Sequence, residues 1–121
     1  DVAEHDRVLA MTSHLPHLLA FALVDSLARQ PASDEIFRCA AGGFRDFTRI
    51  ASSDVVMWRD IALANRDALL AAVDGFTQTL DTVRAAVAAG DAAGLEQVFA
   101  LARAARERYL RCLEQGTISP E

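Results

Sequence analysis

Ten residues near the middle of the chain combine backbone freedom with a dense set of charges: Gly42-Gly43-Phe44-Arg45-Asp46-Phe47-Thr48-Arg49-Ile50-Ala51. Adjacent glycines permit positive φ angles and close approach of the backbone. Arg45 and Arg49 have the spacing of neighbours on one helix face, with Asp46 between them. Because a guanidinium can hold a carboxylate through two parallel hydrogen bonds, this stretch predicts a site for a small acidic ligand.

The same charges also have a purely structural interpretation. Asp46 and Arg49 can pair as an ordinary helix salt bridge, which contributes only a few tenths of a kcal/mol. The spacing fits a ligand-binding Arg49 and an internal ion pair equally well, so both interpretations stand at this point.

Two histidines, His14 and His17, flank Pro16 and form a second candidate site. Proline must kink a helix or occupy the first turn of a new one, with Ser13 as its N-cap. A local break beside ring nitrogens predicts a ligand contact, and two capped or solvated histidines are the alternative. His5 falls on the opposite face of a straight helix from His14, and no Cys or Glu completes a tetrahedral set, so we expect no metal site.

The amino-acid composition limits the classes of partner that the chain is expected to bind. The net charge is −5 and all 12 basic residues are arginines, which argues against nucleic acid. The longest uninterrupted apolar run, Leu18 to Val24, is far shorter than the roughly 20 residues of a bilayer span, so we expect no membrane association. The N-terminal residues lack a signal-peptide pattern. Cys39 and Cys112 fit reduced thiols in a cytoplasmic protein, with a disulfide between them as the minor alternative.

No complete cofactor enzyme is visible in the sequence. It has no Gly-x-Gly-x-x-Gly after a strand, no Walker loop and no recognisable Ser/His/Asp pattern. Twenty-four alanines and three prolines instead predict an all-α fold of about five to six helices. Without a repeat or a low-complexity linker, residues 1–121 are expected to form one domain.

The first helix should be long, from Val2 or Ala3 to about Arg29. Its segment from Leu15 to Leu27 is apolar on nearly every face, which is not typical of a surface helix. We therefore expect this segment to be surrounded by protein, including a second copy of the chain.

Two shorter helices should follow. One is expected from Glu35 to Ala41, with Gly42 as its C-terminal stop. The cluster Ser52-Ser53-Asp54 caps the next, which carries Trp58, the single tryptophan; a large core residue is the commoner fate of such a ring. Asn65 can cap the helix after it.

The last two helices, near residues 66–89 and 92–115, have the clearest periodicity. Gly90 and Asp91 stop one and cap the other, so the two should form an antiparallel hairpin. The arginines of the last helix should be solvated, and the tail from Gly116 should fray. The seam positions follow three-four spacing: Leu69, Val73, Phe76, Leu80, Val83 and Val87, then Leu95, Val98, Ala102, Ala105, Tyr109 and Cys112.

Four motifs between His5 and Asn65 resemble, in their order and spacing, those of the C-terminal helical domain of prephenate dehydrogenase. One departure is Val55 after Asp54, where family members often carry proline, which leaves the start of that helix open. Beyond Asn65 the chain matches only as a generic helical hairpin. The motifs are His5-Asp6 with Leu9-Ala10, Ser13-His14-Leu15-Pro16-His17, the stretch from Gly42 to Ala51, and Met57-Trp58-Arg59-Asp60-Ile61 with Asn65.

The resemblance implies an NAD- or NADP-dependent enzyme of tyrosine biosynthesis that oxidatively decarboxylates prephenate or arogenate. In such enzymes an N-terminal Rossmann domain carries the nucleotide and the catalytic histidine. The helical domain forms an intertwined homodimer that closes the substrate cleft. Since these residues include no Rossmann pattern, the chain should bind no nucleotide and be inactive alone.

The resemblance also implies roles for single residues. Arg49 would bind a substrate carboxylate, and Asp46 would orient or gate it. His14 and His17 would line the pocket for substrate or tyrosine, and Trp58 would line the same cleft. Weaker candidates for substrate binding are His5, Thr48 and Arg45. No catalytic residue is expected in this chain.

A hypothesis of another class is a stand-alone dimeric helical module that senses an aromatic amino acid or binds a partner without catalysis. A strand followed by Gly-x-Gly-x-x-Gly within about 180 residues upstream would favour the dehydrogenase over the module.

Overall fold

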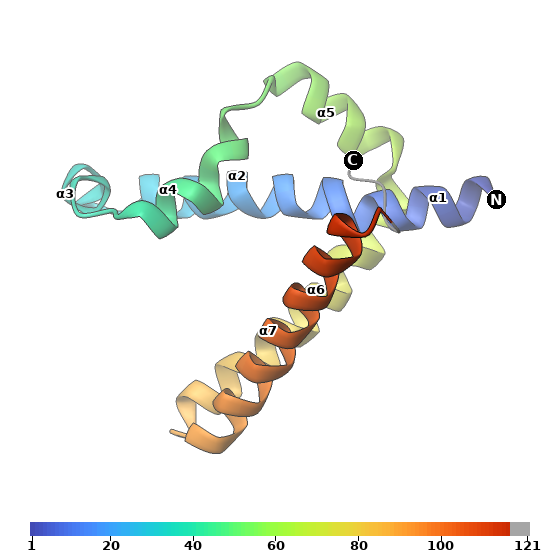
Figure 1. Cartoon of the computed structure of the whole chain (residues 1–121). Coiled ribbons are helices and arrows are strands. Elements are labelled where there is room, and N and C mark those ends of the chain that lie inside the picture. The colour runs from blue at the N-terminus through green and yellow to red at the C-terminus, as the bar shows by residue number, and fades with distance from the viewer. Residues whose placement is uncertain (117–121) are drawn as a thin grey trace. The chain divides into compact units, whose positions relative to one another are not determined.

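The computed structural model describes residues 1–116, which are helical with no strand among them. The all-α prediction is therefore confirmed, while most of the expected frayed tail, residues 117–121, lies outside the described part. The helices group into two compact units, Asp1–Val73 and Asp74–Glu121 (Figure 1). In chain order they are α1 (Val2–Leu9), η1 (Ala10–His14), α2 (Leu15–Ala28), α3 (Ser33–Arg38), α4 (Gly42–Thr48), η2 (Arg49–Ser52), α5 (Val55–Ala64), α6 (Arg66–Ala88) and α7 (Ala92–Glu114).

The first three elements make one long helix, as predicted (Figure 1). The segment η1 is a π-helical turn, in which the Leu15 N–H donates to the Ala10 carbonyl five residues back. Pro16 then lies in the first turn of α2, where its missing N–H is tolerated. The predicted cap at Ser13 is wrong, because the helix continues without a break and His14, at the cap position, makes no side-chain cap.

The apolar helix α2 is poorly covered by its own chain. Ala20 is its buried residue, while Leu18 and Leu23 are 38% and 36% exposed. By length and composition, the continuous helix Val2–Ala28 could cross a membrane, although a helix enclosed by protein passes the same test. The sequence analysis considered only the short apolar run from Leu18 to Val24 and so did not predict that the whole helix could cross a membrane. What covers α2 is therefore a central question for function.

The glycine pair does not behave as predicted. Helix α3 already ends at Arg38, and Gly42 begins α4 instead of stopping a helix. Neither Gly42 nor Gly43 has a positive φ, and nothing lies within 4 Å of a Cβ built on either. The physical reason is that α3 ends in tight turns, with the Cys39 and Ala40 N–H groups donating three residues back. Helix α4 and η2 then pack against α2.

Helix α5 begins at Val55, so the departure from the family's proline leaves its start intact. Asp54 caps it as predicted, accepting a hydrogen bond from the Met57 N–H at 2.7 Å. Asn65 lies directly before α6, and its carbonyl accepts from the Leu69 N–H at 2.9 Å. Its side chain, however, reaches back to the first helix, as described below.

The second unit holds α6 from residue 74 onward and α7, which form the predicted hairpin (Figure 1). Gly90, at φ 63°, ends α6 in a Schellman motif, in which the Asp91 N–H donates to the Ala86 carbonyl at 2.9 Å. Asp91 Oδ1 caps α7 by accepting from the Gly94 N–H. The predicted seam is only partly closed, because Leu80 and Val87 are 55% and 61% exposed.

Candidate ligand-binding site

Three aromatic side chains of the first unit lie together: His14 at the end of η1, His17 in the first turn of α2, and Trp58 on α5. His17 stacks on the indole, with centroids 3.6 Å apart and planes at 15°. His14 meets the same indole edge-on, at 6.1 Å and 77°. All three side chains are half-buried. The structure therefore brings together three of the residues that the sequence singled out.

Each imidazole makes one polar contact inside the unit. His17 Nδ1 lies 2.9 Å from the Ser13 carbonyl. His14 Nδ1 lies 3.3 Å from Asn65 Nδ2, which also donates to the Asp6 carbonyl at 2.9 Å. Sequence reasoning assigned Asn65 only as a helix cap, although its place in the fourth motif was a signal of a wider role.

An apolar pocket of about 320 Å³ opens beside this cluster. His14 and the Trp58 ring lie in its wall, and His17 does not. A pocket with apolar walls and few polar groups is the usual form of a small-molecule site. Its lining residues are His14, Leu18, Phe21, Val55, Trp58, Arg59, Ala62 and Leu69.

Arg49 begins η2, which packs on the helix that carries His17. Its side chain is exposed, and within residues 1–116 it takes part in no ion pair. The same holds for Asp46, so the salt bridge between the two, one of the two interpretations of their spacing, does not form. The guanidinium donors of Arg49 are left available to a partner outside the described residues.

The weaker candidates lie apart from the aromatic cluster. His5 and Arg45 are exposed on α1 and α4, and the Thr48 hydroxyl donates to the Phe44 carbonyl of its own helix at 2.8 Å. No group of three or more His, Cys, Asp or Glu side chains that could hold a metal ion occurs among residues 1–116. Cys39 is an exposed free thiol, as predicted.

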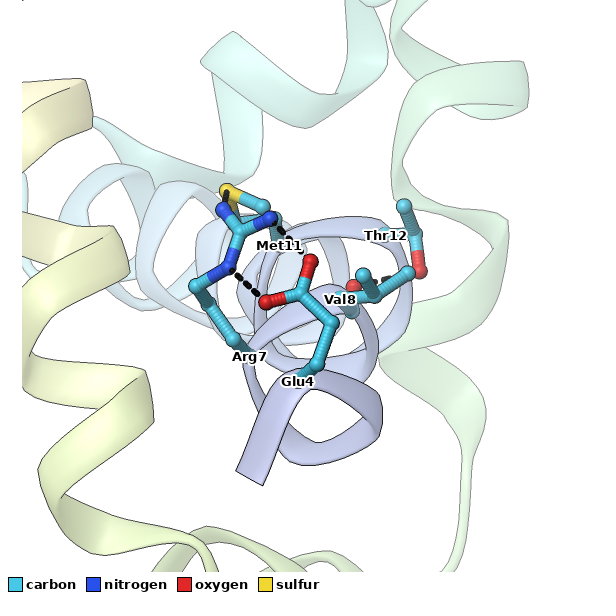
Figure 2. Close-up of polar contacts among 5 residues, drawn as sticks. All are labelled: Glu4, Arg7, Val8, Met11 and Thr12. Carbon is cyan, nitrogen blue, oxygen red and sulfur yellow. Dashed lines mark hydrogen bonds and ion pairs between the residues drawn. The ribbon is translucent and has the colours of Figure 1, made fainter. Parts of the chain in front are cut away.

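The best-formed ion pair lies at the N-terminal end of the first helix (Figure 2). Arg7 Nε and Nη2 donate to the two carboxylate oxygens of Glu4, at 3.0 and 2.6 Å. These hydrogen bonds and the charge of Arg7 hold the pKa of Glu4 below its usual 4.5, and Glu4 raises the pKa of Arg7 in return. Both side chains are 57% exposed, so the pair belongs to the surface.

Comparison with known proteins gives a family for this arrangement. The family model described as prephenate dehydrogenase, dimerization domain, matches residues 1–101. The chain belongs to this family. The match extends well into α7 and so covers all of the first unit and much of the hairpin. The resemblance drawn from the four motifs is therefore confirmed.

Curated relatives carry the same family's names. The chain is 41% identical over 104 residues to cyclohexadienyl dehydrogenase of Zymomonas mobilis, covering 84% of this chain and 36% of that protein. It is 42% identical over 108 residues to prephenate dehydrogenase of Bacillus subtilis, covering 86% and 28%. The chain thus spans about a third of the length of the dehydrogenases that it matches.

Solved structures agree with this assignment. Prephenate dehydrogenase from Aquifex aeolicus, in complex with hydroxyphenyl propionate and NAD+, superposes with a TM-score of 0.82 at 37% identity, over 88% of this chain and 38% of that one. Arogenate dehydrogenase from Synechocystis gives the same TM-score at 26% identity, over 88% and 40%. The dimerization-domain fold is therefore shared with both enzymes.

Proposed function

We propose that residues 1–121 are the C-terminal substrate-binding and dimerization domain of an NAD- or NADP-dependent dehydrogenase that acts on prephenate or arogenate. The observation that carries this proposal is the family match over residues 1–101, together with relatives about three times as long. In the complete enzyme, the remaining length would supply the nucleotide-binding domain and the catalytic groups. Such a biosynthetic enzyme would work in the cytoplasm.

In this proposal Arg49 holds a carboxylate of the substrate. Prephenate is a dianion, and a guanidinium offers two parallel N–H donors that match a carboxylate. The observation in support is that Arg49 is exposed and in no ion pair within the described residues, on an element that packs against α2. Asp46, three residues earlier, would orient or gate it.

His14, His17 and Trp58 would bind the ring portion of prephenate, arogenate or tyrosine. Their rings stack or meet edge-on within one cluster beside an apolar pocket of about 320 Å³. Aromatic walls favour a flat or partly unsaturated six-membered ring, and the imidazole nitrogens add a few directed polar contacts. The site thus combines an anion anchor with an aromatic wall.

The nucleotide would be bound elsewhere in the complete enzyme. A dinucleotide is held at the N-terminus of a helix that follows a strand and a glycine-rich turn, and residues 1–116 contain no strand. These residues do not fit such a group. The chain alone should therefore neither bind NAD nor transfer hydride.

A second copy of the chain would cover the apolar helix α2. The family is described as a dimerization domain, and Leu18 and Leu23 on α2 are more than a third exposed in the single chain. A homodimer thus accounts for the apolar length of Val2–Ala28 without a bilayer.

The test is the activity of the full-length protein that carries this domain. With prephenate or arogenate and either nucleotide, it should form the reduced nicotinamide, seen by its absorbance, while the 121-residue chain alone forms none. Calorimetry on the chain should show no NAD binding. A full-length protein that is folded and dimeric but oxidises neither substrate would favour the non-catalytic sensing module instead.

A further inference from the structure

Three carbonyl groups around the η1 turn receive hydrogen bonds from side chains. The turn contains a wide i to i+5 backbone bond, and the proline that follows has no N–H, so fewer backbone donors are available here than in a regular helix. Three side chains also contact backbone carbonyls in this region. Thr12 Oγ1 donates to Val8 O at 2.8 Å (Figure 2), Asn65 Nδ2 to Asp6 O at 2.9 Å, and His17 Nδ1 lies 2.9 Å from Ser13 O.

The contact of His17 determines which of its nitrogens carries the proton. A carbonyl oxygen only accepts hydrogen bonds, so the Nδ1 atom facing Ser13 O carries the hydrogen. In the neutral ring, Nε2 is then an acceptor. Stacking on Trp58 holds the plane of the ring. The neutral His17 ring therefore carries its acceptor nitrogen at Nε2.

Asn65 imposes the opposite arrangement on His14. A carbonyl oxygen only accepts hydrogen bonds, so it is the amide nitrogen of Asn65, and not its oxygen, that faces the Asp6 carbonyl and His14. One N–H of that amide goes to Asp6 O, and the other faces His14 Nδ1 at 3.3 Å. Because an amide nitrogen only donates, His14 Nδ1 is the acceptor and its proton lies on Nε2.

We propose that Asn65 is a positioning residue that holds His14 as the Nε2–H tautomer, so that His14 donates and His17 accepts through their Nε2 atoms. The assignment of His14 as donor and His17 as acceptor does not depend on the proposed function. Only the ligand rests on it: an oxygen of the prephenate or arogenate skeleton, which accepts from His14. Asn65 reaches His14 from the junction of α5 and α6, across 51 positions of sequence. It therefore ties the element that carries Trp58 to the η1 turn.

The tautomers can be measured directly on the full chain without any ligand. The chain has only 3 histidines, so the ring nitrogens of His14 and His17 can be resolved in an imidazole ¹⁵N spectrum at alkaline pH, with exposed His5 as the reference. We expect a pyridine-type signal from Nδ1 of His14 and from Nε2 of His17. A pyridine-type signal from Nε2 of His14 would overturn the proposal.

The isosteric variant Asn65→Asp tests the cause. A carboxylate accepts where the amide donated, so His14 should switch to the Nδ1–H tautomer, while His17, held by Ser13 O, keeps its own. The unchanged His17 signal is the internal control for correct folding of the turn. If His14 keeps the Nε2 proton in Asn65→Asp, Asn65 does not set the tautomer.

Kinetics on the full-length protein separate this proposal from the proposed function. Asn65→Asp should raise the Michaelis constant for prephenate or arogenate roughly three- to tenfold, as expected for one lost hydrogen bond, with kcat changed much less. A switched tautomer with an unchanged Michaelis constant would remove the positioning role. Lack of dehydrogenase activity in the wild-type protein would instead refute the proposed function, and the ligand-free tautomers would still decide the assignment for Asn65.

Discussion

Arg49 is an exposed arginine that forms no ion pair within residues 1–116. In residues 1–116, the four ion pairs join Glu4 to Arg7, Asp25 to Arg29, Arg59 to Asp60 and Arg103 to Glu107. Each of these pairs joins residues that are at most four positions apart in sequence. Arg49 and Asp46 have a spacing that would allow the same and do not pair. The Arg49 guanidinium is therefore able to bind a carboxylate of the ligand, as proposed above.

Replacement of Arg49 by alanine should weaken substrate binding in the full-length enzyme. Loss of a charge-assisted hydrogen bond costs about 1.5–3 kcal/mol, so the Michaelis constant for prephenate or arogenate should rise about tenfold to a hundredfold. The constant for the nucleotide should change little. Arg38→Ala, which removes an exposed arginine at the end of α3 outside the candidate site, is the matched control and should behave like the wild type. Equal effects of both variants would remove Arg49 from the site.

The ion pair of Glu4 with Arg7 predicts how the stability of the folded chain depends on pH. Its pKa is lowered in the folded chain by the hydrogen bonds and charge of Arg7, so the stabilisation is present above pH 4.5 and is lost as the pH falls through the lowered value. Carboxyl ¹³C titration should place the Glu4 midpoint below 4.5, and Arg7→Gln should return it toward that value. A Glu4 midpoint unchanged by Arg7→Gln would contradict the pairing.

At the scale of elements, local chemistry explains most of the helix boundaries. Asp54 and Asp91 cap α5 and α7 because a carboxylate can accept from the N–H three residues on, and the sequence reveals such residues directly. The long first helix was predicted from another local signal, because its apolar and helix-forming residues continue past Pro16. The contact of Asn65 with the Asp6 carbonyl, just before the π turn, was not predicted, because Asn65 is distant in sequence.

The errors have separate physical causes. Gly42 was predicted to end a helix because glycine tolerates a positive φ, but the chain had already turned at Cys39 and Ala40. The contact of His14 with Asn65 was not predicted, because 51 positions of sequence separate the two residues and only the folded chain brings them near. Spacing identifies which residues share a face, whereas hydrogen-bond partners across the fold require the structure.

The two glycines of α6 and its C-terminal turn should respond oppositely to alanine. Gly90 has a φ of 63°, which costs an L-residue roughly 1–2 kcal/mol, so Gly90→Ala should lower the free energy of unfolding. Gly75 lies inside the helix with nothing within 4 Å of an added Cβ, so Gly75→Ala should raise it by about 0.5–1 kcal/mol. Urea unfolding at one protein concentration measures both. Changes of the same sign would contradict this account of the turn.

At the scale of the whole molecule, the amount of exposed surface is the main feature. The chain exposes 9236 Å². A compact protein of 13.1 kDa exposes about 6,400 Å², and two separate compact units of the same total mass about 7,700 Å². Both reference areas lie below the exposed area of the chain, as expected for a protein that buries further surface in a dimer.

The buried residues lead to the same conclusion. In the described part of the chain, the buried hydrophobic residues are Ala10, Ala20 and Leu69, and no charged or polar residue is buried. A core of this size does not offset the conformational entropy of ordering more than a hundred residues. Large apolar side chains on both units remain exposed, among them Leu63, Phe99 and Leu101. The fold therefore requires further apolar contacts, which a second copy would supply.

Sedimentation equilibrium of the 121-residue chain tests this claim most directly. At micromolar concentration, without ligand or nucleotide, we expect a single species of about 26 kDa, twice the mass of 13.1 kDa. When the protein is diluted, the helix content measured by circular dichroism should fall together with the fraction of dimer. The reason is that the apolar helix α2 would no longer be covered by the second copy. A fully helical monomer of 13.1 kDa at micromolar concentration would contradict the account.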